Sequence, residues 1–196
     1  FKGIFDDKIN EKIKKFIKNS KNIKEDKIDS LSLDFDQKIL IIFLANKNNE
    51  YQSEKNGAKF HDYIKANKIE KIALIGSNFS SIKNKIGFSE FLHGVELKSY
   101  EFNLYKSKKN DKLINIDILK NKNQINKNTK SKLDAVLKGV NFTKDLVSEP
   151  GNILHPDEYA KRLIKLKKIG LKVTVYDEKK LKKLGCNALL GVGQGS

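Results

Sequence analysis

One stretch organises the chain, and its sequence is Asp145-Leu146-Val147-Ser148-Glu149-Pro150-Gly151-Asn152-Ile153-Leu154-His155-Pro156. It contains both prolines of the protein. The residue before a proline is disfavoured in the α region, so a helix should end at Glu149. Pro156 suits the first position of a following helix, where its missing N–H costs nothing. The stretch therefore predicts a hinge between two structural units.

The composition indicates a soluble globular protein. With 196 residues, 38% of them hydrophobic and 33% charged, the chain can bury the core of one domain or slightly more. No apolar run approaches the roughly 18 residues of a membrane span. The first residue is Phe1, no signal-peptide pattern precedes the first polar residues, and Cys186 is the only cysteine. An internal disulfide is therefore excluded, and a reducing, cytoplasmic location is expected.

The net charge of +16 raises the question of nucleic-acid binding. Arg162 is the only arginine, although the planar arginine fork is the usual reader of bases and phosphates. The lysines are spread through almost every segment, which favours a solvated surface over a dedicated nucleic-acid site. Weak nonspecific attraction to polyanions stays compatible with this charge.

Hydrophobic periodicity predicts an α/β fold in the first part of the chain. The expected elements in chain order are helix 6–18, a strand or hairpin arm at 31–35 before Ile39, strand 38–45, helix 53–66, strand 70–76, helix 87–99 and strand 114–118. The polar segments 19–30, 106–112 and 120–132 are expected as loops. Strand, helix and strand between residues 38 and 76 form a βαβ unit, so those two strands are predicted to be parallel.

Around and beyond the hinge, the pattern stays α/β. Helices are predicted at 131–148 and 156–169, the second one ending at Gly170 in the C′ position. Leu171 to Val175 alternates like a half-buried strand, and Asp177 should cap a short helix that ends at Gly185. Ala188 to Val192 is predicted to be another strand.

The residues that most often carry chemistry form no recognisable constellation. The three histidines are far apart in sequence and show no metal-ligand spacing. His61 and His93 are expected to be exposed helix residues, and His155 is expected at a helix N-cap with a hinge role. Cys186 is expected to be a small buried residue beside a strand start, with no nearby histidine to activate it. The acidic neighbours Asp6/Asp7 and Asp34/Asp36 read as solvated side chains.

A glycine-rich segment, Gly191-Val192-Gly193-Gln194-Gly195-Ser196, follows the last predicted strand. It lacks the Lys-Ser/Thr pair of a phosphate-binding P-loop, and no helix follows it here to supply amide donors. From the residues alone, no catalytic, cofactor-binding or metal-binding residue is assigned.

From Phe142 onward, the order of motifs resembles the leucyl aminopeptidase (cytosol aminopeptidase) family. The pieces that carry the resemblance are Lys144-Asp145-Leu146-Val147, Ser148-Glu149-Pro150-Gly151-Asn152 with Pro156, Gly170-Leu171-Lys172-Val173, Leu181-Lys182-Lys183-Leu184-Gly185 and Val192-Gly193-Gln194-Gly195-Ser196. Segments 72–76 and 100–106 match more loosely. Lys144 replaces the usual arginine, and the N-terminal part is shorter, with a first strand expected to be missing.

The resemblance implies an N-terminal α/β domain with a mostly parallel central sheet at 1–130, a linker helix and hinge at 131–150, and the beginning of a peptidase catalytic domain at 151–196. It also implies a cytoplasmic, hexameric parent enzyme that uses two divalent metal ions, Mn or Zn, to remove N-terminal residues from peptides. In that family the metal ligands and catalytic residues follow Gly-Gln-Gly-Ser, so this chain is expected to be inactive alone. The alternative is a nucleic-acid-binding or oligomer-assembly module.

Overall fold

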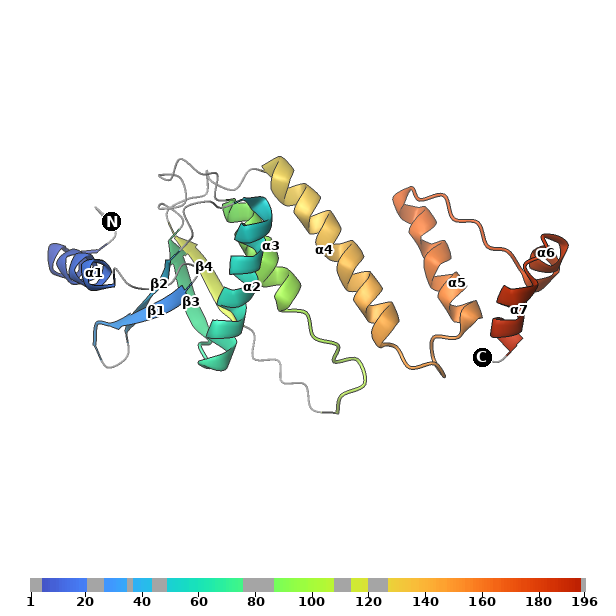
Figure 1. The fold of residues 1–196 in the computed structure, drawn as a ribbon, viewed down its shortest axis with the longest axis horizontal. Coiled ribbons are helices and arrows are strands. Elements are labelled where there is room, and N and C mark those ends of the chain that lie inside the picture. The colour runs from blue at the N-terminus through green and yellow to red at the C-terminus, as the bar shows by residue number, and fades with distance from the viewer. Residues whose placement is uncertain are drawn as a thin grey trace. The chain divides into compact units, whose positions relative to one another are not determined.

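The computed structural model describes residues 5–20, 27–34, 37–43, 49–75, 87–107, 114–119 and 127–194. The chain divides into two compact units, Phe1–Lys138 and Gly139–Ser196. The boundary between them lies inside helix α4 (Figure 1). The predicted positions of Asp36, Gly76, Gly195 and Ser196, with parts of the loops at 106–112 and 120–132, lie outside the described residues.

The first unit confirms the α/β class. Its elements in chain order are α1 (Asp7–Asn19), β1 (Lys27–Ser32), β2 (Lys38–Phe43), α2 (Glu50–Ala66), β3 (Lys71–Ile75), α3 (Phe88–Lys98), β4 (Asn115–Leu119) and the start of α4 (Lys127–Ser148). Side-chain caps begin two of the helices: Asp6 Oδ1 accepts from the Ile9 N–H at 2.7 Å, and Asn49 Oδ1 from the Gln52 N–H at 2.8 Å. Two segments predicted as loops are partly regular, since β1 begins at Lys27 and α4 begins at Lys127.

The described strands form two pairs. β1 and β2 are antiparallel, with Lys27 opposite Phe43, whereas β3 and β4 are parallel, with Lys71 opposite Asn115. The βαβ unit is therefore β3–α3–β4. The sequence predicted this unit one strand earlier, with β2 and β3 as its parallel strands. In the structure β2 pairs with β1 instead, and β1 begins in a segment that was predicted to be a loop.

Helices α2 and α3 pack against each other and carry the core of the first unit (Figure 1). Phe60 and Ile64 of α2 meet Phe91 and Val95 of α3, and Leu74 of β3 completes the buried cluster. The rings of Phe60 and Phe91 have centroids 5.5 Å apart. Each such side chain contributes about 1.5–3 kcal/mol when fully buried. Partly buried residues from the strands, among them Ile28, Ile42 and Ile116, pack against this cluster.

Two glycines let these helices come unusually close. A Cβ atom built on Gly57 would lie 1.9 Å from the carbonyl oxygen of Phe91, and one built on Gly94 would lie 1.9 Å from that of Glu54. Real Cβ atoms do not approach a backbone oxygen this closely. Only glycine fits at these two points, so the α2–α3 contact depends on both residues.

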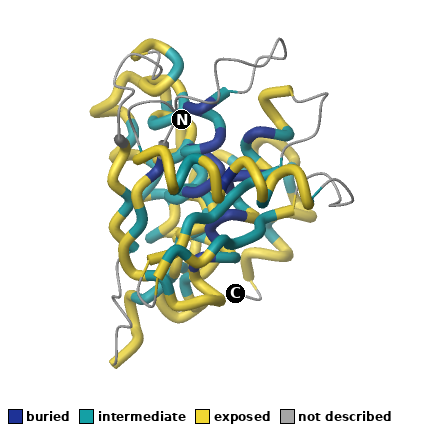
Figure 2. Tube along the Cα trace, turned by 90° about the vertical axis from the view of Figure 1, so that its left-hand side faces the viewer, coloured by how far each residue is buried: buried dark blue, intermediate teal, exposed yellow. Residues whose placement is uncertain are grey.

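The second unit contains α5 (Pro156–Ile164), the 3₁₀ helix η2 (Lys165–Ile169), α6 (Glu178–Lys183) and α7 (Asn187–Gln194). Gly170 ends η2 with φ +92, and Asp177 Oδ1 caps α6 by accepting from the Lys180 N–H at 2.8 Å. Both predicted helix signals are confirmed. In contrast to the first unit, none of its described residues is buried as a whole residue, the class coloured dark blue in Figure 2.

Two predicted strands of the second unit are wrong in this structure. Residues 188–192 lie in α7, because a short apolar run has the same pattern in a strand and in a buried helix. Residues 171–175 are in neither a helix nor a strand. A strand needs a pairing neighbour, and none of the described residues pairs with this segment. The glycine-rich segment is therefore largely helical, not a loop after a strand.

Candidate functional site

The predicted hinge is built around the only arginine. α4 ends at Ser148, and Glu149 and Pro150 leave the helix as expected. The Pro150 carbonyl then accepts hydrogen bonds from the N–H groups of Ile153 and Leu154, both at 2.9 Å, which turns the chain. His155 occupies the N-cap of α5 without a side-chain cap bond, and Pro156 follows at the start of the helix.

Arg162 ties this turn to α5. Its Nη1 donates to Glu149 Oε1 at 2.8 Å, and its Nε donates to Glu158 Oε1 at 3.2 Å. The Glu149 side chain is only 3% exposed and that of Arg162 22%. The hydrogen bond that Arg162 donates to Glu149 is the main cause that raises the pKa of Arg162, and the one that it donates to Glu158 comes second. The planar guanidinium holds two carboxylates at once, which a lysine ammonium matches poorly. The hinge thus has a structural clamp, which the sequence did not reveal.

The two helix histidines, predicted to be exposed, are buried instead. His61 is 6% exposed and His93 2%, because the close α2–α3 packing encloses more than one face of each helix. Among the described residues, neither Nδ1 atom has a hydrogen-bond partner. Burial is the main cause that lowers the pKa of His61, and nearby Lys65 adds to it. The sequence did contain a signal that His61 is buried. It lies one helical turn away on either side, at Gly57 and Ile64.

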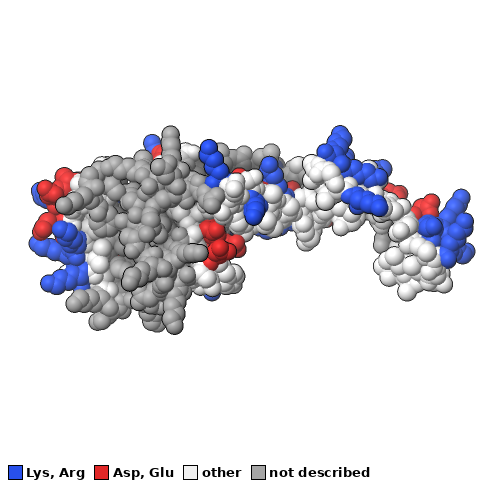
Figure 3. Space-filling view, turned by 90° about the horizontal axis from the view of Figure 1, so that it is seen from above, with Lys and Arg blue, Asp and Glu red and all other residues white. Residues whose placement is uncertain are grey.

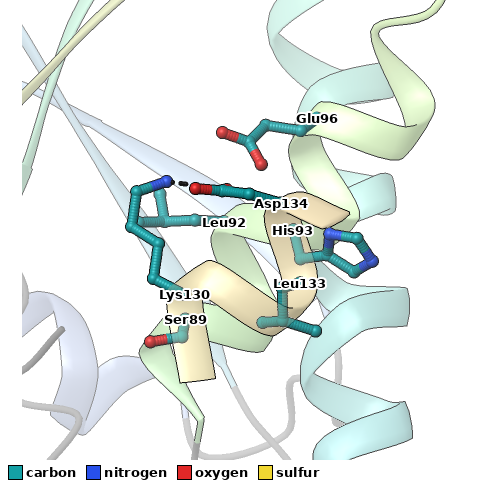
Figure 4. Close-up of a pocket in the computed structure, with 7 residues that line it drawn as sticks. All are labelled: Ser89, Leu92, His93, Glu96, Lys130, Leu133 and Asp134. Carbon is teal, nitrogen blue, oxygen red and sulfur yellow. Dashed lines mark hydrogen bonds and ion pairs between the residues drawn. The ribbon is translucent and has the colours of Figure 1, made fainter. Parts of the chain in front are cut away.

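His93 borders a small cavity between α3 and the start of α4 (Figure 4). Its lining consists of Ser89, Leu92, His93 and Glu96 of α3 with Lys130, Leu133 and Asp134 of α4. Lys130 Nζ is 3.0 Å from Asp134 Oδ1, and His93 Nε2 is 4.0 Å from Glu54 Oε2. The cavity volume of about 10 Å³ accommodates one water-sized sphere. A peptide substrate does not fit there.

The other candidates from the sequence stay apart. Asp6 caps α1, Asp34 is exposed, and His155 is exposed at the hinge. Cys186 is half-buried and precedes α7, so the expected strand start beside it is wrong. In the described ranges, no three residues among His, Cys, Asp and Glu are grouped so that they could hold a metal ion. The described part of the chain therefore does not fit a two-metal centre.

The α/β fold of the chain is similar to the folds of solved enzymes. The fold is similar to that of a tomato leucine aminopeptidase mutant, with a TM-score of 0.67 over 94% of this chain and 39% of that chain at 20% sequence identity. It is also similar to the bottromycin maturation enzyme BotP, described in complex with Mn, with a TM-score of 0.62 over 87% of this chain and 37% of that one at 16% identity.

Sequence comparison names the family. Residues 141–196 match the family model described as "Cytosol aminopeptidase family, catalytic domain". A "Probable cytosol aminopeptidase" of Phytoplasma mali (strain AT) is 45% identical over 113 residues, and one of Phytoplasma australiense is 37% identical over 145 residues. Over the matched residues, the chain is similar to the cytosol (leucyl) aminopeptidase family, a family of peptidases, as the motif order had indicated.

The match is partial on both sides. It covers 54% of this chain and 22% of the Phytoplasma mali protein, and 71% of this chain and 28% of the Phytoplasma australiense protein. The matched part thus spans about a quarter of the length of these relatives. Separately, no helix in the described part of the chain is long and apolar enough to cross a membrane.

Proposed function

We propose that the chain is the N-terminal portion of a two-metal leucyl aminopeptidase that hydrolyses N-terminal residues from peptides. The observation that carries the proposal is the match of residues 141–196, which include the hinge, to the family's catalytic domain. The similarity in fold over 94% of the chain to a leucine aminopeptidase supports it. The parent enzyme would work in the cytoplasm as a homo-oligomer, a hexamer by resemblance to the family.

In this proposal the chain supplies structure, and the remainder of the catalytic domain supplies the chemistry. Two divalent ions, Mn or Zn, would bind the substrate amine and carbonyl and activate water in the parent enzyme. The described residues offer no matching ligand group. We therefore expect residues 1–196 alone to be inactive.

The nucleic-acid alternative is not favoured. The single arginine is held by Glu149 and Glu158, so it is not free to read bases or phosphates. Exposed lysines of η2 and α6 create positive surface (Figure 3). The acidic residues Asp177 and Glu178 lie beside those of α6. Lysine charge alone gives only salt-sensitive, nonspecific attraction.

The test is hydrolysis of leucine p-nitroanilide with Mn²⁺ or Zn²⁺ added. The chain alone should show no metal-dependent activity above a buffer control. A mixture of the chain with the C-terminal part of the Phytoplasma mali relative, produced separately, should show it. Activity of residues 1–196 alone would overturn the proposal that the chain supplies structure and the remainder of the catalytic domain supplies the chemistry. An inactive mixture whose parts have assembled would count against the aminopeptidase proposal itself.

A further inference from the structure

Helix α2 contains the only Asn-Gly pair of the sequence, Asn56-Gly57. In an unfolded chain, an asparagine before glycine readily loses its side-chain amide, because glycine has no Cβ to keep its nitrogen away from the neighbouring side chain. Asparagine is for this reason among the thermolabile residues of proteins. The pair therefore has a chemistry of its own, which the surrounding fold either permits or blocks.

The reaction needs only water as a partner. The backbone nitrogen of Gly57 attacks the side-chain Cγ of Asn56, so that a new C–N bond forms while the C–N bond to the side-chain amide breaks. The attacking nitrogen gives up its proton, and the leaving amide takes up a proton and departs as ammonia. Water then opens the resulting succinimide ring at either carbonyl, and no group is oxidised or reduced. The products are aspartate, or isoaspartate, in which the main chain runs through the former side chain and is longer by a CH₂ group.

The helix blocks the first of these steps. α2 runs from Glu50 to Ala66, with Asn56 and Gly57 in its interior. In an α-helix the N–H of each residue donates to the carbonyl four residues earlier, so ring closure has to break this bond and rotate the peptide after Asn56 out of the helical conformation. The reacting side chain is held as well. Asn56 is 2% exposed, and its Oδ1 accepts from Gln52 Nε2 at 3.2 Å.

Helix α3 keeps α2 in this state and also requires the glycine. A Cβ atom built on Gly57 would lie 1.9 Å from the carbonyl oxygen of Phe91. A larger residue at position 57 would shield the nitrogen and slow the reaction, but it does not fit against α3. The packing that demands glycine here therefore also protects the labile pair that this glycine creates.

Both products oppose the return of this packing. Aspartate would place a carboxylate at a position that is 2% exposed, where the loss of hydration disfavours the charge. Isoaspartate would lengthen the main chain and shift the residues that follow against the helical hydrogen-bond ladder. Phe60 lies one turn further along α2 and belongs to the buried cluster. A modified chain should therefore rebuild the α2–α3 core poorly.

We propose that Asn56-Gly57 is a modification site, at which water converts asparagine to aspartate or isoaspartate when α2 and α3 separate, and that the conversion hinders the two helices from packing again. Chemical modification of the opened state is one way in which unfolding becomes irreversible. The site lies within the first unit and does not depend on the proposed function.

Peptide mapping by mass spectrometry measures the reaction in the full 196-residue chain at neutral pH. In guanidinium chloride, Asn56 should convert faster than any other asparagine. In buffer alone its conversion should be at least about tenfold slower, because only the opened fraction of the chain reacts. Equal rates with and without denaturant, or faster conversion of another asparagine in the unfolded chain, would overturn the proposal.

Two glycine variants test the protection without changing the reacting pair. Gly94→Ala would place its Cβ 1.9 Å from the carbonyl oxygen of Glu54, so it should part the helices and speed the conversion of Asn56 in buffer several-fold. If this variant does not fold, its rate in buffer should equal its rate in denaturant. Gly139→Ala, whose Cβ meets nothing within 4 Å, should leave the rate unchanged. An unchanged rate in Gly94→Ala would show that α3 does not protect the site.

Refolding tests the consequence of the modification. After a long incubation in guanidinium chloride and removal of the denaturant, size-exclusion chromatography separates refolded from misfolded chains. Molecules in which OH has replaced NH₂ at position 56 should be enriched several-fold in the misfolded fraction. Asn56→Gln is the control, because ring closure onto the longer side chain is much slower, and its recovery should not depend on the incubation time. Equal amounts of modified chain in both fractions would contradict the proposed block on packing.

Discussion

The two units of the chain differ in what holds their helices. In Phe1–Lys138, α2 and α3 bury phenylalanine rings and histidines between them and against the strands. In Gly139–Ser196, the helices are set by local signals: a proline at the start of α5, a left-handed glycine after η2 and an aspartate cap on α6. Short helices draw most of their stability from tertiary packing. The comparison teaches that local signals can define a helix's limits even where its described residues form no buried core.

The two units should differ most in how much stability they lose when a side chain is truncated. Phe60→Ala removes a ring that is 1% exposed and packed on Phe91, so it should lower the free energy of unfolding by about 3–5 kcal/mol. Val147→Ala in the second unit removes methyl groups at a residue that is 81% exposed. Its effect should stay within about 0.5 kcal/mol. Urea denaturation followed by circular dichroism measures both, and similar losses would contradict the contrast.

Glycine substitutions should have opposite signs in the two units. Gly57→Ala or Gly94→Ala places a methyl group against a backbone oxygen of the facing helix, which should cost about 1–3 kcal/mol as α2 and α3 separate. Gly139→Ala is the matched control inside α4, where a Cβ meets nothing within 4 Å. Alanine there should stabilise the helix by about 0.5–1 kcal/mol. The same denaturation curves give the result, and a stabilising Gly57→Ala would mean that the helices pack less closely.

Sequence patterns identified the elements whose signals are local. The helix at α3, the strand at β3, the cap at Asp177 and the break at Pro150 each depend on neighbouring residues, and each was predicted within a few positions. Pairing and burial depend on distant residues, and here the parallel pairing of β2 with β3 and the exposure of His61 and His93 were predicted wrongly. His61 and His93 looked like exposed polar positions, because the enclosing contact is made by Gly57 and Gly94 on two different helices.

The same reasoning explains the errors after the hinge. The alternation at 171–175 correctly indicates strand-forming side chains, but a strand exists only with a partner. The apolar run at 188–192 is too short for its period to separate helix from strand. The clamp at Arg162 was missed for a different reason: a single arginine carries no periodic signal, although its rarity in this chain was visible. The family motifs were recognisable because their order along the chain is itself a long pattern.

Acid should weaken the first unit through His61. Its pKa lies below the ordinary value of about 6.5, so the unfolded chain binds the proton more readily than the folded chain. Stability is therefore full above pH 6.5 and falls as the pH drops from there towards the lowered pKa. The charged groups around it are Asp62, Lys65, Lys98 and Glu101. His61→Gln should flatten the dependence of the unfolding free energy on pH between 7 and 5. An unchanged slope would mean that groups other than His61 cause the pH dependence.

The smallest effect on global stability is expected at the hinge, where a substitution should change amide exchange only locally. Arg162→Ala removes both hydrogen bonds that join the turn to α5, so amides from 149 to 162 should exchange several-fold faster. Arg162→Lys keeps the charge but cannot reproduce the fork, so it should give an intermediate result. Lys161→Ala removes a neighbouring exposed lysine and should leave exchange unchanged. The urea midpoint of the first unit should not move in any of the three, because its core contains no residue of the hinge. If that midpoint shifted with Arg162→Ala, the two units would be coupled through the clamp, and the contrast between a packed unit and a locally defined one would have to be replaced by a single cooperative structure.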